Sequence, residues 1–508
     1  MKRYLILALA LGLSAAAACD DDSDDSNTGA VGAAGSDANE TGGSAGKPAG
    51  GSGGSGKAAG GSGGAATTSQ NNASTAGRGG APGAAGKAAG GSGGALSASS
   101  TGGSGGSGEP AAGSGGVAAE KDIVDTAVAA GNFKQLAGAL TKANLVEALK
   151  GAGPFTVFAP TDAAFDALEK AKPGTVAGLS VEQLTNVLKY HVLSGAGVKA
   201  AELKNGQLVK TLAGPVAAID LSGDKPKING TVISTTDIVA KNGVIHVIDA
   251  VLLPPSDIIE VATAAGKFGK LAAALTAANL VNDLKGEGPF TVFAPTDEAF
   301  AKLSAVPSGD ALKNVLLYHV ISGAVGPVDL KEGGAAVTLS GSPVLFALKD
   351  GAKINDAKIT TTNVVAKNGV IHIIDSVIVP PADDIVATAV AAGSFTKLAG
   401  ALTSASLVSA LQAKGPFTVF APTDDAFAKL SAVPSGDALK NVLLYHVVEG
   451  VVGAGDLKAG SVSTLLKDES LTIDLTSGVK VNSSSVTKAN ILTKNGIIHV
   501  IDTVLVPN

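Results

Sequence analysis

The feature that most constrains the fold of this chain is a ten-residue segment, GPFTVFAPTD, which occurs three times without a change. The copies begin at Gly153, Gly288 and Gly415, and the sequence around them repeats with a period of about 127 residues, lengthened in the first copy. Solenoid repeats have units of roughly 20 to 50 residues, whereas a period of this length is the size of a whole domain. The repetition therefore predicts three tandem domains of one fold.

The N-terminal part of the chain differs in composition from the repeats. Residues 20–118 consist mostly of Gly, Ser and Ala. Such a segment buries too little apolar surface to offset the conformational entropy that ordering costs. We therefore expect a disordered tether there, followed by domains at residues 119–254, 255–381 and 382–508.

Residues 1–19 have the layout of a secretory signal peptide. Two basic residues precede an apolar run and then small residues up to Cys19, and the run is too short for a stable membrane span. The end of this segment resembles the lipobox of bacterial lipoproteins, although Ala16 stands where that motif prefers Leu. The resemblance implies that Cys19 is acylated and anchors the chain to a membrane. Ordinary cleavage, with Cys19 removed or unmodified, is the alternative.

These features predict an exported protein, either a lipoprotein of the cell envelope or a protein of the cell surface or extracellular space. Cys19 is the only cysteine, so the domains cannot form an internal disulfide. The formal net charge of −6 and the lack of a Lys/Arg cluster argue against a nucleic-acid partner. Aromatic residues make up only 3% of the chain, so we expect cores of aliphatic side chains and Ala.

Each repeat begins with a helical pattern. In the first copy, apolar residues recur at helical spacing from Ile123 onward, and Gly131 separates them into two short helices. The segment FTVFAP, which begins at Phe155, is rich in residues that favour strands. Thr161 and Asp162 are both suitable N-cap residues for the helix that follows. The repeated segment therefore predicts a corner between a strand and a helix, with its phenylalanines in the core.

The second half of each repeat is predicted to be β-structure. A helix that ends near Tyr190 is followed by glycines and then by segments rich in β-branched residues. Asn242-Gly243, between two apolar runs, predicts a tight hairpin. Both faces of the next strand, which contains His246, are apolar, so we expect that strand to be buried. The predicted fold class is α+β, with helices mainly in the N-terminal half of each domain.

Three motifs together carry a resemblance to a known family. TVFAPTDAAF, a Tyr-His pair and NGVIHVIDAVLLP follow one another in this order in the first copy, with close variants in the other two. In this respect the chain resembles the fasciclin, or FAS1 (beta-Ig-H3), domain family, and the resemblance covers nearly all of residues 119–508. It implies three copies of a wedge-shaped β-sandwich with several helices.

All six histidines of the chain lie in the repeats, two in each: His191 and His246, His319 and His372, His446 and His499. Zinc sites need three or four ligands, and a catalytic triad needs a nucleophile and an acid beside the histidine. Neither set recurs around the histidines in all three copies. We therefore expect no enzyme, no catalytic, metal or cofactor-binding residue and no cofactor, and interpret these residues as core histidines bonded to backbone or tyrosine hydroxyl groups.

The family resemblance adds a second interpretation of some of these residues. It implies that the Tyr-His region and a nearby Asp-Ile pair take part in adhesion. The candidate adhesion or structural residues are Tyr190, His191, Asp237, Ile238, Tyr318, His319, Tyr445 and His446. The second and third copies have Asn363-Val364 and Asn490-Ile491 in place of the Asp-Ile pair, so the acidic group is found only in the first copy.

The function that these observations favour is adhesion or matrix binding at the cell surface or outside the cell, through tandem FAS1 modules. The expected partners are surface or matrix proteins or polysaccharides, together with a membrane that holds the N-terminal lipid anchor. A structural spacer of the envelope without a ligand is the first alternative. A hydrolase or metalloprotein is the second.

Overall fold

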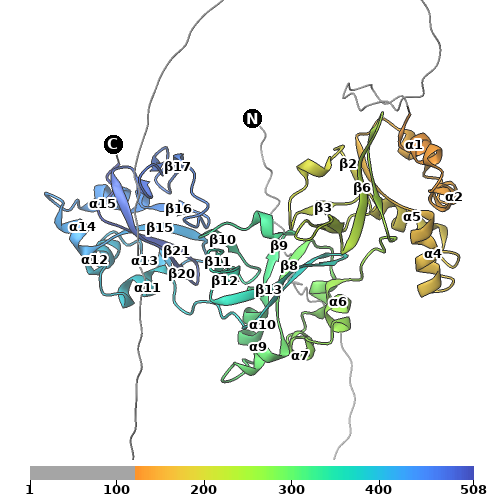
Figure 1. The fold of residues 1–508 in the computed structure, drawn as a ribbon. Coiled ribbons are helices and arrows are strands. Elements are labelled where there is room, and N and C mark those ends of the chain that lie inside the picture. The colour runs from red at the N-terminus through yellow and green to blue at the C-terminus, as the bar shows by residue number, and fades with distance from the viewer. Residues whose placement is uncertain (1–120, 508) are drawn as a thin grey trace, which may run out of the picture. The chain divides into compact units, whose positions relative to one another are not determined.

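The computed structural model describes residues 121–507. The predicted signal peptide, Cys19 and the predicted tether lie outside these residues. Within the described part of the chain, one order of five α-helices and seven strands occurs three times (Figure 1). Three tandem domains of mixed α+β structure are therefore confirmed, and the helices lie mainly in the N-terminal half of each.

The elements of the three domains correspond one to one. The first domain contains helices α1 (Ile123–Ala130), α2 (Lys134–Lys142), α3 (Val146–Lys150), α4 (Asp162–Ala171) and α5 (Val181–Tyr190), and strands β1 (Phe155–Pro160), β2 (Val192–Ser194), β3 (Leu208–Lys210), β4 (Val216–Asp220), β5 (Lys227–Ile228), β6 (Thr231–Ala240) and β7 (Gly243–Ile248). The second contains α6 (Ile258–Ala264), α7 (Gly269–Ala277), α8 (Val281–Lys285), α9 (Asp297–Ala301) and α10 (Gly309–Tyr318), with β8 (Phe290–Pro295), β9 (Val320–Ser322), β10 (Ala335–Val337), β11 (Pro343–Ala347), β12 (Lys353–Ile354), β13 (Ala357–Ala366) and β14 (Gly369–Ile374). The third contains α11 (Ile385–Ala391), α12 (Thr396–Ser404), α13 (Val408–Leu411), α14 (Asp424–Ala428) and α15 (Gly436–Tyr445), with β15 (Phe417–Pro422), β16 (Val447–Glu449), β17 (Gly460–Ser463), β18 (Ser470–Asp474), β19 (Lys480–Val481), β20 (Ser484–Thr493) and β21 (Gly496–Ile501).

The seven strands of each domain form one sheet that folds over on itself. In the first domain the strand order is β2-β1-β7-β6-β5-β4-β3, in which β1 and β7 are parallel and the other pairs are antiparallel. Phe158 of β1 and Ile219 of β4, which have three strands between them in this order, share one buried cluster. The two halves of the sheet therefore enclose a core between them, which makes the domain a β-sandwich.

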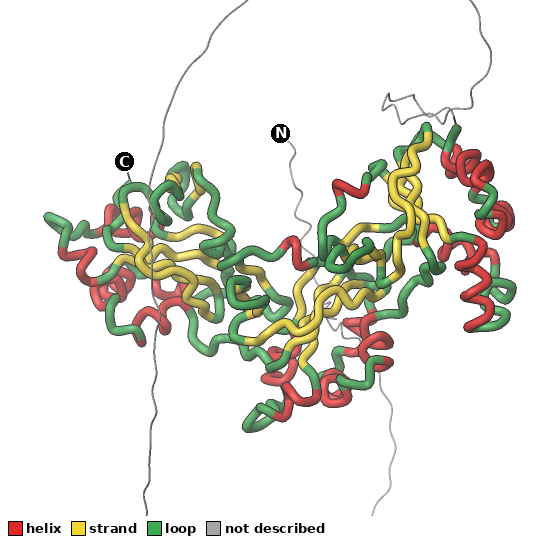
Figure 2. The backbone as a smooth tube through the Cα atoms, in the orientation of Figure 1, coloured by secondary structure: helices red, strands yellow, loops and turns green. Residues whose placement is uncertain are grey.

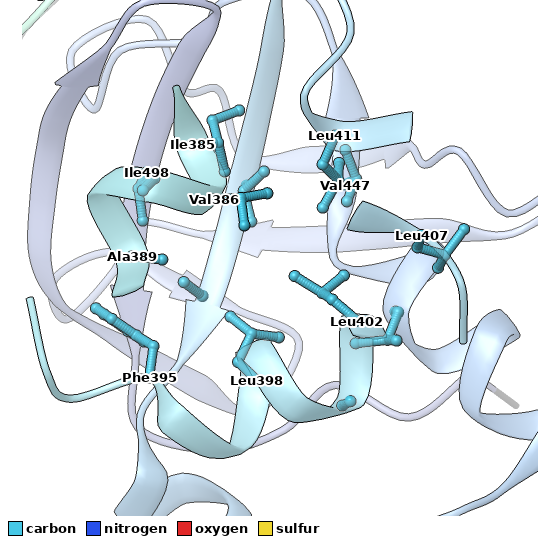
Figure 3. Close-up of a cluster of buried hydrophobic side chains, with 14 of the residues drawn as sticks. Ile385, Val386, Ala389, Phe395, Leu398, Leu402, Leu407, Leu411, Val447 and Ile498 are labelled. Atoms are coloured by element: carbon cyan, nitrogen blue, oxygen red, sulfur yellow. The ribbon is translucent and has the colours of Figure 1, made fainter. Parts of the chain in front are cut away.

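A second core lies between the sheet and the helices, which gather on one side of the strands in each domain (Figure 2). Figure 3 shows this core in the third domain, where Phe395, Leu398 and Leu402 pack toward Val447 and Ile498 of the sheet. Burial of one such side chain contributes roughly 1.5–3 kcal/mol. Aliphatic residues thus supply most of the core, as the composition predicts.

The repeated ten-residue segment is the corner between β1 and α4, as predicted. Thr161 is the N-cap of α4 and accepts a hydrogen bond from the backbone N–H of Ala164 at 3.2 Å. Asp162 is the first residue of α4, and its carboxylate instead accepts the backbone N–H of Gln135 at 2.7 Å. The acid therefore caps α2, whose own N-cap residue, Phe133, has no polar side chain. Of the phenylalanines in and beside the corner, Phe158 and Phe165 are buried, whereas Phe155 is half-buried.

The β6–β7 hairpin turns one residue earlier than the sequence predicts. Ala240 pairs with Gly243, so the turn residues are Lys241 and Asn242. The side chain of Asn242 accepts the N–H of Ile123 at 3.0 Å and donates to the carbonyls of Leu149 and Gly151, at 2.7 and 2.8 Å. Asparagine is required here because it ties the hairpin to α1 and α3. Gly243 is required because a Cβ would lie 2.0 Å from the Phe155 carbonyl oxygen.

Candidate functional site

Helix α5 ends in the Tyr-His pair, and both side chains are buried. The Tyr190 hydroxyl donates to the carbonyl of Val216 at 3.0 Å and accepts from the side-chain amide of Asn229 at 2.7 Å. Asn229 also accepts the N–H of Ala218 at 2.8 Å. The tyrosine therefore ties the end of a helix to the far half of the sheet, and burial raises its pKa to about 12.

The same network occurs in the other two domains, through Tyr318 with Asn355 and Tyr445 with Asn482. Sequence analysis missed these asparagines. The signal was present, because an asparagine follows Lys-Ile or Lys-Val at this place in every copy. All three have a left-handed backbone, with φ between 49° and 53°, which asparagine tolerates better than most residues.

The first histidine of each domain bridges two backbone groups. In His191, Nδ1 donates to the Val187 carbonyl at 2.8 Å and Nε2 accepts the N–H of Leu252 at 2.9 Å. These partners select the neutral ring protonated on Nδ1. Burial lowers the pKa of His191 to about 4. His319 and His446 have the matching pairs of bonds and the same lowered pKa.

The second histidine has the opposite tautomer. In His246, Nε2 donates to the Val198 carbonyl at 2.9 Å and Nδ1 accepts the N–H of Asp237 at 3.4 Å. Its ring stacks on Phe158 with centroids 5.4 Å apart, and burial lowers its pKa. His372 and His499 repeat this arrangement.

The ring nitrogens of all six histidines are thus bonded to backbone groups. Of the two expected kinds of partner, only the backbone groups are found, because the tyrosine hydroxyls bond asparagines and carbonyls. Within residues 121–507 there is no group of three or more His, Cys, Asp and Glu side chains that could hold a metal ion. The geometry makes the histidines internal braces of each domain.

The Asp-Ile pair lies in strand β6, where the pairing with β7 shifts register. Asp237 has φ of 61°, and its exposed carboxylate accepts the N–H of Ala200 at 2.8 Å. Ile238 is half-buried and packs against the helical core. The backbone N–H of Asp237 donates to His246, whereas Tyr190 and His191 have other hydrogen-bond partners. The candidate residues of the first domain therefore do not form one cluster.

The two asparagines that replace Asp237 bind the preceding domain. The side-chain amide of Asn363 donates to the carbonyl of Gly206 at 2.9 Å, and that of Asn490 donates to the carbonyl of Gly333 at 3.1 Å. Both asparagines are only partly exposed and have φ of 58° and 62°. In the second and third domains this position is therefore part of a joint between domains, which sequence analysis did not predict.

The side-chain oxygen at the position of Asp237, Asn363 and Asn490 has a hydrogen-bond partner in two domains and none in the other, and the sequence explains this difference. Asn490 Oδ1 accepts the N–H of Ala454 at 2.8 Å, as Asp237 does from Ala200. Asn363 Oδ1 is the one buried side-chain polar atom without a partner among residues 121–507. The residue that matches Ala200 and Ala454 in the second domain is Pro327, which has no N–H to donate.

The three domains share one fold and the same buried hydrogen bonds of tyrosine and histidine, although their sequences differ. The chain is therefore a tandem array of one kind of domain. The profile of the Fasciclin domain family matches residues 131–254, 266–380 and 393–507. The chain belongs to the fasciclin domain family, as the resemblance of its motifs implies.

Several known proteins are similar to this chain in sequence. The chain is 30% identical to human periostin over 388 residues. This match covers 73% of this chain and 45% of periostin. It is 30% identical over 390 residues to the transforming growth factor-beta-induced protein ig-h3 of Sus scrofa, covering 74% of this chain and 56% of that protein. Protein sll1483 of Synechocystis sp. is 45% identical over 133 residues, which is 24% of this chain and 73% of that protein. The chain thus spans about half the length of the first two relatives.

A solved structure of a FAS1 domain pair from the insect cell adhesion molecule Fasciclin I covers 50% of this chain and 97% of its own, with 15% identity and a TM-score of 0.24. Among residues 121–507, no helix combines the length and apolar character needed to cross a membrane.

Proposed function

We propose that this protein acts in adhesion at the cell surface, where its three fasciclin domains bind surface or matrix proteins or polysaccharides. The observation that carries the proposal is that fasciclin domains make up nearly the whole of the described chain. Several modules in one chain also favour multivalent contact, in which weak single-site binding adds up through a high effective concentration.

The proposed contact surface is the stretch of β6 from Asp237 to Val239 in the first domain, called the β6 edge because β5 pairs only with the start of β6, at Thr231 and Val232. Asp237 is exposed there, and Val239, two residues further on, is 52% exposed. In the second and third domains the residues that match Val239, Val365 and Leu492, are only partly exposed, and the neighbouring asparagines are bonded to another domain. The first domain alone therefore offers this edge to an external partner.

The Tyr-His pairs have a structural role in this proposal. Tyr190 and His191 are 0% and 2% exposed, and their polar atoms are bonded within the domain. A buried, fully bonded side chain gains no contact with an external ligand. Their contribution to adhesion is indirect, through the stability of the domains that present the surface.

The proposal includes export and membrane attachment. Acylated Cys19 would hold the chain at a membrane, and residues 20–118 would separate the domains from it. Mass spectrometry of the mature N-terminus tests this part. A mass increased by a diacylglycerol group and a fatty acid on Cys19 is the expected result, and an unmodified N-terminus beyond or before Cys19 would contradict it.

Deletion of residues 119–508 in cells that naturally carry the chain tests adhesion itself. We expect weaker cell–cell attachment and weaker attachment to the extracellular material of the same cells, with the amount of N-terminal segment unchanged. Unaltered attachment would contradict the proposal. In parallel, the purified chain should bind that extracellular material saturably. A spacer without a ligand would bind nothing saturably, and stoichiometric metal in the purified protein would instead indicate a metalloprotein.

A further inference from the structure

The joints between consecutive domains follow one rule. Asn363 donates to Gly206, and Asn490 donates to Gly333, and each pair is 157 residues apart in the chain. The strands around these bonds also match, because β13 lies against β4 and β20 lies against β11. The two joints therefore share these contacts, with a donor side on the later domain and an acceptor side on the earlier domain, and the second joint adds further bonds, among them that of the Ala335 N–H to Asp456 at 2.7 Å.

The acceptor side is a β-bulge. Gly206 and Gln207 together oppose Ile219: the Gly206 N–H donates to the Ile219 carbonyl at 2.9 Å, and the Ile219 N–H donates to the Gln207 carbonyl at 2.8 Å. Gly206 has φ of 79°, as the first residue of a glycine bulge requires. Because the Gly206 carbonyl takes no part in these two bonds, it is free to accept from the next domain.

The second domain repeats this bulge, and the third domain lacks it. Gly333 and Gly334 oppose Phe346 with bonds of 2.9 Å each, and Gly333 has φ of 68°. In the third domain Gly460 alone pairs with Ile473, because the strand from Gly460 to Leu465 is one residue shorter than its counterpart in the second domain and the turn that follows is one residue longer. The acceptor carbonyl is thus present in the two domains that a further domain follows, and is missing from the last.

The donor side shows the reverse pattern. Its asparagine is replaced in the first domain by Asp237, whose carboxylate cannot donate a hydrogen bond. The residue after the Val198 carbonyl is Lys199, where the other domains have Gly326 and Gly453. A Cβ at those glycines would lie 2.9 and 2.5 Å from the carbonyl oxygens of Gly206 and Gly333, so a side chain there blocks the joint.

We propose that Asp237 and Lys199 on the first domain, and the bulge-free Gly460 edge on the third, are caps that prevent the ends of two copies of this chain from joining. A head-to-tail interface that does not close into a ring continues into an open filament. Repeat proteins avoid this outcome through atypical terminal repeats. Here the chain carries the working interface only at its two internal joints.

The electrostatics at the capped end support this assignment. A carboxylate in the place of the Asn363 amide would face a carbonyl oxygen and would lose water without gaining a hydrogen bond. Val239 at the same edge is 52% exposed, whereas its counterparts Val365 and Leu492 are only partly exposed, so an apolar side chain suits this position when a domain precedes it. The cap at this end therefore consists of two polar residues, Asp237 and Lys199, on an unchanged fold.

The first experiment transfers the cap into an internal joint of the full chain. Spin labels on Lys189→Cys and Lys313→Cys, both exposed residues, report the distance between the first two domains in a Cys19→Ser background. We expect Asn363→Asp to broaden the distance distribution at least twofold. The same chemical change in reverse, Asp237→Asn, is the matched control and should leave the distribution unchanged. An Asn363→Asp distribution identical to that of the parent would overturn the proposal.

The second experiment removes both caps from the full chain. The restored variant combines Lys199→Gly and Asp237→Asn with one glycine inserted after Ala459, and sedimentation velocity measures its association up to about 1 mM, the effective concentration that short linkers provide. We expect the restored variant to associate with increasing concentration and the natural chain to remain monomeric. Head-to-tail association of the natural chain, abolished by Val239→Glu, would overturn the proposal, as would a restored variant that stays monomeric.

Discussion

The Nε2 atom of His191 accepts the backbone N–H of Leu252 at 2.9 Å, across 61 residues of the chain. The same ring donates to the Val187 carbonyl, so one side chain joins the end of α5 to the segment that follows β7. His319 with Ile378 and His446 with Leu505 repeat this relationship. The first histidine of every copy therefore fastens the C-terminal segment of its domain to the end of the fifth helix.

These histidines make stability depend on pH. The pKa of His191, His319 and His446 is about 4 in the folded domains, compared with the ordinary value of 6.5. Between these values the unfolded chain binds a proton that the folded chain does not, so the free energy of unfolding falls as the pH falls from 6.5 toward 4. The loss should reach about 3 kcal/mol per domain, at 1.36 kcal/mol for each pKa unit.

Urea unfolding at pH 7.5, 6 and 5 measures this effect. The interval above pH 5 is the decisive one, because carboxylates in unfolded chains titrate near pH 4 and add little there. His246, His372 and His499, whose pKa burial also lowers, act in the same direction. Stability that is equal at pH 7.5 and 5 would show that these rings are not held neutral by the fold.

Truncation of a bridging histidine should destabilise its domain strongly. His319→Ala leaves the Val315 carbonyl and the Ile378 N–H buried without partners. We expect a loss of about 2–5 kcal/mol in the free energy of unfolding, since each unsatisfied buried group costs roughly 1–3 kcal/mol. Lys313→Ala, at an exposed position of the same helix, is the control and should change stability by no more than about 0.5 kcal/mol. Equal effects of the two substitutions would contradict the bracing role.

The tyrosine network gives a prediction about coupling. Tyr190→Phe removes the hydroxyl between Asn229 and the Val216 carbonyl and should cost about 1–3 kcal/mol. Asn229→Gly keeps the left-handed backbone while it removes the same bond. The double variant should therefore lose less than the sum of the two single losses, by about 0.5–3 kcal/mol in a double-mutant cycle. Strict additivity would mean that the two side chains act independently.

Asn368, which matches Asn242 in the β13–β14 hairpin of the second domain, should not tolerate aspartate. In Asn368→Asp the side chain can still accept the N–H of Ile258. A carboxylate oxygen, however, replaces the amide NH₂ that donates to the carbonyls of Leu284 and Gly286. We expect the unfolding free energy to drop by about 2–4 kcal/mol, because donors become acceptors that face acceptors. Asn279→Asp, the same change at an exposed residue of the same domain, is the control. A similar loss in both variants would point to the charge alone.

Much of the fold could be predicted from the sequence because its signals are local. Apolar spacing locates the helices after Ile123, and the run from Phe155 and the cap at Thr161 locate the strand–helix corner. Buried strands around His246 follow from their apolar composition. Repetition multiplies these signals, since each pattern is seen three times.

The polar contacts could not be predicted because their partners are distant in the chain. Asp162 looks like a local cap but binds a helix 27 residues earlier, and Asn242 looks like a turn residue but binds groups as far as 119 residues away. The joint between Asn363 and Gly206 spans two domains. The clearest difference at this position in the sequence is Asn in place of Asp, which the family resemblance interprets as the loss of an adhesion group.

The central claim is that residues repeated in all copies stabilise the domains, whereas the unrepeated Asp237 edge makes contact with the partner. The attachment of cells that carry Asp237→Ala with Val239→Lys tests it most directly, at a temperature where circular dichroism shows every variant folded. Val128→Lys, at a residue that is 58% exposed in the same domain, is the control. We predict that attachment falls to the level of the domain deletion in the edge variant and is unchanged in the control. Undiminished attachment in the edge variant would contradict the account.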